Sequence, residues 1–186
     1  MNHSKQNPNR FIGFLFIALF VLGACSSSSR SKKPTTDASS DIATDMNLPP
    51  DPGEAGMETV AGIDSDTDGV RDDIQRYIAL TYPDQPEVQR ALKQYAKADQ
   101  DYLLTGDDPV KARENALKVG DAIDCLFFKS PENASKIFRK MHAESLNTKE
   151  RILANDKMDS LLSGQVFPTA KIGEEAKSCD DYEEAK

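Results

Sequence analysis

Apolar residues recur at intervals of three and four from Val70 onward in this 186-residue chain. This spacing places them on one face of an α-helix, whereas a half-buried strand would carry them at alternate positions. No stretch alternates with a period of two for long enough to predict a sheet. The sequence therefore predicts an all-α domain over residues 61–186, built as a small bundle of about five helices.

Start and stop signals divide this pattern into helices. A capping residue followed by proline begins a helix well, and glycine or proline commonly follows its end. Asn147 and Glu150 also have the spacing of a capping box. The expected boundaries are Val70 to Pro83, near Pro86 to Gly106, a start at Asp108-Pro109, a start at Ser130-Pro131, and Asn147 to Gly164.

The inward faces of the helices follow from the same spacing. The loop at 166–168 is expected to pack down on the domain. The residues predicted to face the core are Ile74, Tyr77, Ile78 and Tyr82; Val88, Leu92, Tyr95, Ala96 and Leu103; Ala112, Ala116, Val119, Ile123, Leu126 and Phe127; Ile137, Phe138 and Met141; and Ile152, Leu153, Leu161 and Leu162.

The first 25 residues have the three parts of an export signal. Lys5 and Arg10 form a positive head, and the uncharged apolar run from Phe11 is about 14 residues long, shorter than the roughly 20 that a membrane-spanning helix needs. The run ends in Leu22-Gly23-Ala24-Cys25, which resembles the lipobox of bacterial lipoproteins. The resemblance implies a signal peptide over 1–24, cleavage before Cys25 and attachment of lipid to Cys25.

The lipoprotein resemblance also implies an address. Lipoproteins carry several acyl chains, and two or more chains hold a protein stably on a membrane. Because Ser26 rather than an aspartate follows Cys25, the resemblance implies the bacterial cell envelope, at the outer membrane on its periplasmic or surface face. Residues 25–60 show no apolar period and are expected to form a flexible tether.

Charge narrows the range of partners. The net charge of −8 becomes −10 once Lys5 and Arg10 leave with the signal peptide. An acidic surface disfavours nucleic acid. The lipid anchor then provides the membrane contact, and an envelope protein, not identified by the sequence, is the expected macromolecular partner.

Two cysteines remain once Cys25 carries lipid. In an oxidising compartment, Cys125 and Cys179 most simply form a disulfide, which would pin the polar C-terminal tail to the helices. The alternative is a thiol pair with a redox or metal role. It has little support, because the chain has no Cys-x-x-Cys and His142 is the only histidine after residue 25.

The strongest chemical pattern in the chain is a run of alternating aspartates that ends in glycine, Asp64-x-Asp66-x-Asp68-Gly69. Alternating carboxylates on a sharp turn can converge on a hard cation such as Ca²⁺, which takes six to eight oxygen ligands. The run resembles the EF-hand-like calcium loop, and in particular its thrombospondin type 3 and dockerin-like branch. The resemblance implies Ca²⁺ ligands at Asp64, Asp66, Asp68, Val70 (through its carbonyl), Asp72, Asp73 and Gln75.

Two features depart from the calcium-loop pattern. Gln75 stands where the family has a bidentate Glu or Asp, and Asp51-Pro52-Gly53 before the loop does not form an entering helix. We therefore expect half of an EF-hand with weak affinity, with a dissociation constant on the order of 10⁻⁴–10⁻³ M. The alternative is an acidic turn in which Asp72 and Asp73 favour the helix dipole without a metal.

Other catalytic patterns are weak. His142 is a single histidine expected at the surface, and no Ser/His/Asp or Cys/His set can be assembled without it. The acids on the predicted helices, such as Asp99, Asp101, Asp121 and Asp124, are expected on solvated faces. The favoured function is a non-catalytic, membrane-tethered module with a structural calcium loop. A carboxylate-dependent hydrolase of envelope material and an inhibitor or immunity-type protective protein remain as alternatives.

Overall fold

The computed structural model describes residues 47–183, and within them the fold is all-helical with no strand. The signal peptide over 1–24, the lipidation site Cys25 and the first part of the expected tether lie outside the described residues. The elements are η1 (Gly53–Met57), α2 (Asp72–Thr81), α3 (Pro86–Leu103), α4 (Pro109–Lys129), α5 (Ala134–Ser145), α6 (Lys149–Leu161) and η2 (Glu175–Ser178). None of the described helices is both long and apolar enough to cross a membrane.

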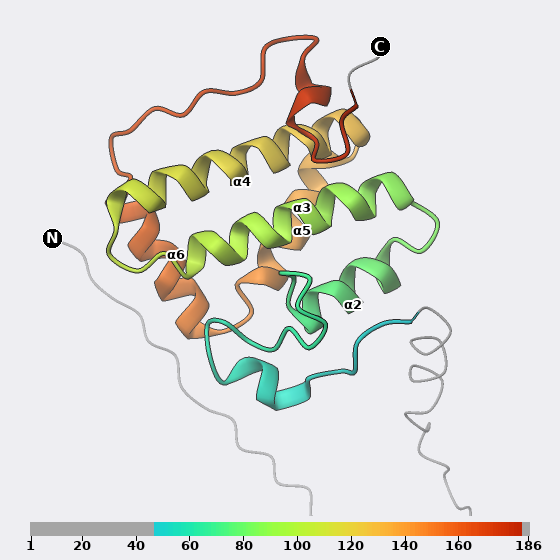
Figure 1. Cartoon of the computed structure of the whole chain (residues 1–186), viewed down its shortest axis with the longest axis vertical. Coiled ribbons are helices and arrows are strands. Elements are labelled where there is room, and N and C mark those ends of the chain that lie inside the picture. The colour runs from blue at the N-terminus through green and yellow to red at the C-terminus, as the bar shows by residue number, and fades with distance from the viewer. Residues whose placement is uncertain (1–46, 184–186) are drawn as a thin grey trace, which may run out of the picture. The chain divides into compact units, whose positions relative to one another are not determined.

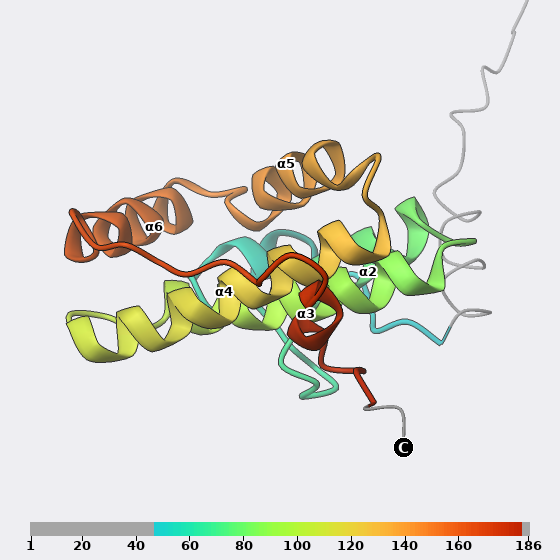
Figure 2. The ribbon, with the colours of Figure 1, turned by 90° about the horizontal axis from the view of Figure 1, so that it is seen from above.

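The five α-helices form two layers. Helices α3 and α4 lie side by side, and α5 and α6 follow one another across them, as the two views show (Figures 1 and 2). The main core lies among α2, α3, α4 and α5, where Ile78, Leu92, Leu126 and Met141 are fully buried. A second, smaller core lies at the other end of α3, where Tyr102 packs with residues of α4 and α6.

All five predicted α-helices are present, but two of the predicted caps differ. Asp108 caps α4 as expected, since its carboxylate accepts hydrogen bonds from the amides of Val110 and Lys111. The cap of α6 is Thr148, whose hydroxyl accepts from the amide of Arg151 at 3.2 Å, and not Asn147. Helix α5 begins at Ala134, later than the Ser130-Pro131 signal predicts, because residues 131–133 form a separate turn.

The predicted inward face of α6 is confirmed at Leu161 and Leu162, which belong to or pack against the second core, but it is wrong for Ile152 and Leu153. Ile152 and Leu153 are 45% and 55% exposed, whereas Met158 and the cationic Arg151 are fully buried. Phe127 of α4 is also exposed. Of the 166–168 loop, Phe167 packs against the second core as expected, whereas Val166 is exposed.

Residues 49–60, which the sequence places in the tether, contact the helical domain instead. The Arg76 guanidinium donates to the carbonyl of Pro49 at 2.9 Å. The buried Arg151 donates to the carbonyls of Gly56, Thr59 and Val60 at 2.6, 3.1 and 3.3 Å. Any free tether in this protein therefore ends before residue 49, and the packed domain starts earlier than residue 61.

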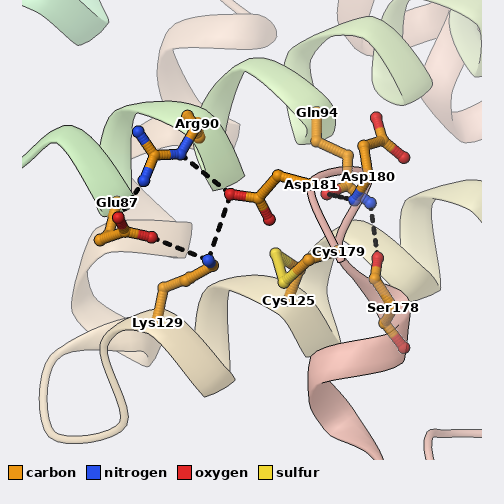
Figure 3. The surroundings of a disulfide bond; sticks show 9 residues. All are labelled: Glu87, Arg90, Gln94, Cys125, Lys129, Ser178, Cys179, Asp180 and Asp181. Atoms are coloured by element: carbon orange, nitrogen blue, oxygen red, sulfur yellow. Dashed lines mark hydrogen bonds and ion pairs between the residues drawn. A yellow bond between two sulfur atoms is a disulfide. The ribbon is translucent and has the colours of Figure 1, made fainter. Parts of the chain in front are cut away.

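The C-terminal segment is held on the helices by the predicted disulfide between Cys125 of α4 and Cys179 (Figure 3). Polar contacts surround the bond. Asp181 accepts from Arg90 at 2.9 Å and from Lys129 at 3.2 Å, and Glu87 bonds to the same two cations. The C-terminal segment therefore lies against α3 and α4 and is fixed there by the disulfide and the ion pairs of Asp181.

Loss of the disulfide should destabilise the domain. A bond that joins residues 54 positions apart is worth about 4 kcal/mol in the chain-entropy model. We expect Cys179→Ser to lower the free energy of unfolding by about 2–4 kcal/mol, measured by denaturant unfolding of the full-length chain. Ser178→Ala is the matched control, because Ser178 offers its carbonyl, not its side chain, to Gln94. Equal stability of Cys179→Ser and the control would contradict the prediction.

Candidate functional site

The aspartate loop is folded by its own backbone before any ligand is considered. The Asp72 amide donates to the carbonyl of Ile63 at 2.8 Å, which closes residues 63–72 into a ring at the start of α2. Gly69 has a φ of +88°, and a Cβ there would lie 2.5 Å from Cε of Lys97. Glycine at this position therefore provides both the left-handed turn and the room for Lys97.

Three of the predicted ligands converge. One carboxylate oxygen from each of Asp64, Asp66 and Asp72 lies within 4.8 Å of the others. Inside the loop, Asp64 accepts from the Gly69 amide at 3.0 Å, and Asp72 accepts from the Ser65 amide at 2.9 Å. Backbone donors thus orient the carboxylates toward a common point while leaving further lone pairs free.

The remaining predicted ligands are placed differently. Asp68 accepts from the Val70 amide at 2.8 Å and has a second oxygen 3.8 Å from the Lys93 ammonium. The Val70 side chain belongs to the main core. Asp73 is not among the converging aspartates and forms a salt bridge with Arg71. Burial opposes ionisation of Asp73, but the hydrogen bonds and charge of Arg71 outweigh it and lower its pKa.

Gln75 reaches the loop from the first turn of α2. Its amide nitrogen donates to Asp66 at 3.1 Å, and this hydrogen bond holds the pKa of Asp66 below its ordinary value. Gln75 is only 6% exposed, and its amide oxygen has no hydrogen-bond partner among the described residues. The same is true of Oδ1 of Asp64.

The electrostatics of the loop favour a cation. Asp72 is 1% exposed, and a buried carboxylate is costly unless it is paired or coordinates a metal. Within residues 47–183, no lysine or arginine forms a salt bridge with Asp64, Asp66 or Asp72. Three carboxylates without salt bridges thus converge, and the same loop holds two buried oxygens without hydrogen-bond partners, one of Asp64 and one of Gln75. A divalent ion bound by the converging carboxylates would supply the missing positive charge.

A second polar cluster, which the sequence did not predict, lies in a cleft between the helices. The Tyr95 hydroxyl lies 3.2 Å from Oδ1 of Asp99 and 2.9 Å from Nδ1 of His142, whose ring stacks on Phe138. His142 is half-buried, not a surface residue, and Asp99 is 4% exposed, not on a solvated face. The spacing of Tyr95 and Asp99 places them on one face of α3, so their contact could have been predicted. Nothing in the sequence placed His142 beside them.

Burial dominates the titration of the Tyr95 cluster. It raises the pKa of Asp99, against the opposing effects of His142, Ser145 and Arg71. Burial and the neighbouring carboxylate also raise the pKa of Tyr95, which keeps its hydroxyl protonated. A carboxyl group with a raised pKa in a cleft is what a carboxylate-dependent hydrolase requires of its general acid.

Comparison of the chain with protein-family models, with curated proteins and with solved structures gives no match.

The raised pKa of Asp99 should make stability depend on pH. The folded state holds this proton more tightly than the unfolded chain, where the pKa is near 3.8. The stability that protonated Asp99 contributes to the fold is therefore fully present below the unfolded pKa. It is lost as pH rises through the pKa of the folded state. We expect the stability of the wild type to fall relative to Asp99→Asn between pH 4 and 8, by about 1.4 kcal/mol for each pH unit between the two pKa values.

Denaturant unfolding at several pH values measures this difference. The control is Asp156→Asn, which changes the same charge at an exposed position of α6. If the wild type instead gains stability relative to Asp99→Asn as pH rises, the pKa of Asp99 is lowered in the folded state, and burial is not its main determinant.

Proposed function

We propose that the protein is a membrane-tethered, non-catalytic lipoprotein of the bacterial envelope, with a structural Ca²⁺ in the Asp64–Gln75 loop and a helical domain that binds an envelope protein. One observation carries the calcium part: the carboxylates of Asp64, Asp66 and Asp72 converge with no salt bridge among the described residues, and Oδ1 of Asp64 is buried without a hydrogen-bond partner. Hard oxygen ligands of this kind suit Ca²⁺ and not softer metals.

The role of the ion would be structural. The loop lies between residues 56–60, held by Arg151, and α2, whose Ile74 and Ile78 enter the main core. An ion bound by Asp64 and Asp72 would neutralise the repulsion of the loop carboxylates and fix the N-terminal segment against α2. Rotation of the Gln75 amide would bring its oxygen to the position where its nitrogen now bonds Asp66, since the two ends of an amide are nearly the same size.

Calcium should stabilise the full-length chain. At about 10 mM Ca²⁺ and a dissociation constant near 1 mM, binding adds about 1.4 kcal/mol, which raises Tm by roughly 3–6 °C. Asp64→Asn should abolish most of the shift, and thermal unfolding together with calorimetric titration measures both. Asp84→Asn is the control, because Asp84 is an exposed aspartate outside the loop.

Gln75→Glu tests the calcium proposal with a variant that should strengthen binding, whereas Asp64→Asn should weaken it. A carboxylate at this position would add charge and a bidentate ligand, so we expect Ca²⁺ affinity to rise by about tenfold. The same variant should be less stable than the wild type in a chelator, where the new charge faces Asp66. No heat and no Tm shift in either the wild type or Gln75→Glu would sink the calcium proposal.

The tether part rests on the resemblance of Leu22–Cys25 to a lipobox, and its residues lie outside the described structure. Cys25→Ala should abolish lipid attachment, since the thiol is the attachment point that the resemblance implies. We expect the variant to leave the membrane fraction and to lose incorporation of a labelled fatty acid. Retention of label would contradict Cys25 as the lipidated residue, whatever the calcium result.

A hydrolase is the second candidate, because the buried Asp99 lies in a cleft and has a raised pKa. Release of soluble fragments from envelope material by the wild type, lost in Asp99→Asn, would replace the non-catalytic proposal.

A further inference from the structure

The cleft beside Tyr95 has the size of a small-molecule site. It has a volume of about 400 Å³ and lies where α3, α4, α5 and α6 meet, and binding sites for small molecules commonly occupy such clefts between helices. Its lining includes residues of both cores, Tyr95 of the first and Tyr102 of the second.

The charge lining the cleft is negative. Its two carboxyl groups are Asp99, whose pKa burial raises, and Asp159, which is exposed; among the described residues that line it there is no lysine or arginine, and His142 is the one histidine. Neither carboxylate takes part in a salt bridge within the part of the chain that the structure describes. Each accepts a hydrogen bond from a tyrosine, Tyr95 to Asp99 at 3.2 Å and Tyr102 to Asp159 at 3.0 Å. A carboxylate offers about four acceptor positions, so both retain capacity for a further donor.

The walls of the cleft are aromatic and aliphatic. Phe138 packs edge-on against Tyr95 and stacks on His142, so the three rings form one continuous wall. Phe167 closes another side, and the Arg113 guanidinium already lies 5.1 Å from the centroid of its ring. Aromatic faces attract cations, and a carboxylate beside such a face adds charge and a hydrogen-bond acceptor.

We propose that this cleft binds a small organic cation, an amine with an aromatic or aliphatic body. Its ammonium group would lie toward Asp99 and Asp159, and its body against the ring wall and Val119. The apolar walls favour an organic ligand over a bare metal ion, and the uncompensated carboxylates disfavour an anion. The inference goes beyond the calcium and tether proposals and does not depend on either.

A matched pair of probes tests the selection for charge. 2-Phenylethylamine and 2-phenylethanol share ring and chain length and differ in the ammonium group. A probe of this size should bind with a dissociation constant in the millimolar range, on the order of 1–10 mM. Saturation-transfer NMR on the full-length chain should show saturable binding of the amine, with the alcohol at least about tenfold weaker.

Variants assign the binding to this cleft. Asp159→Asn should weaken binding of the amine at least about fivefold, because it removes charge while the exposed position leaves the cores intact. Asp99→Asn should do the same. Asp156→Asn, on the same helix as Asp159 but outside the cleft, should leave binding unchanged.

Three results would overturn the proposal. They are no binding of the amine up to about 50 mM, roughly five times the upper end of the expected range; equal affinity for the alcohol; or an unchanged affinity in both Asp99→Asn and Asp159→Asn. Circular dichroism of each variant shows whether it remains folded, and Asp159→Asn carries the test if Asp99→Asn does not fold.

Discussion

The packing of this domain depends on one buried cation. Arg151 is the largest fully buried side chain, and its guanidinium joins α6 to the segment before the aspartate loop by donating to three backbone carbonyls and to Asn147. Burial lowers its pKa, yet it forms no salt bridge within residues 47–183, so backbone carbonyls rather than a carboxylate replace its water. The fit leaves no space at Gly62, where a Cβ would lie 2.8 Å from both Arg151 and Arg71. Residue 62 therefore has to be glycine for the chain to pass between Arg151 and Arg71 into the aspartate loop.

The carboxylates of the loop divide into one that is paired with arginine and three that are not. The position at which the chain enters the loop explains this division. Arg71, just before α2, donates through two nitrogens to Asp73 and through the third to the carbonyl of Ser145 in α5. Asp73 is thereby turned toward the helices. Asp64, Asp66 and Asp72 are left together with no salt bridge to the described lysines and arginines, although charges of one sign repel at this separation. Backbone amides and the N-terminus of α2 compensate part of this charge, and the proposed ion would compensate the rest.

The sequence predicted what depends on local spacing and failed where tertiary contacts decide. The five helices follow from apolar periodicity and from caps such as Asp108-Pro109, and the disulfide follows from two cysteines left over. The convergence of Asp64, Asp66 and Asp72 agrees with a pattern readable in the sequence. The inward side of α6 was readable at Leu161 and Leu162 but not in its first turns, where Ile152 and Leu153 are exposed and Arg151 is buried. A buried arginine needs carbonyl partners some ninety residues away in sequence, and no local pattern records them. The burial of Asp99 and His142 depends on α3 and α5 in the same way.

The presence or absence of a salt bridge distinguishes the acidic residues that stabilise this fold from those that could bind a ligand. Glu87 and Asp181 lie in the network with Arg90 and Lys129 around the C-terminal segment, where every carboxylate has a cation and the interactions are satisfied within the protein (Figure 3). Within residues 47–183, Asp64, Asp66 and Asp72 of the loop and Asp99 and Asp159 of the cleft form no salt bridge, although Asp72 and Asp99 are buried, where an isolated charge costs most. A chain with a net charge of −8 has many acids at its surface, so acidity alone identifies no site. Burial without a salt bridge does, because such a carboxyl group either keeps its proton, as the raised pKa of Asp99 favours, or takes positive charge from a bound ligand.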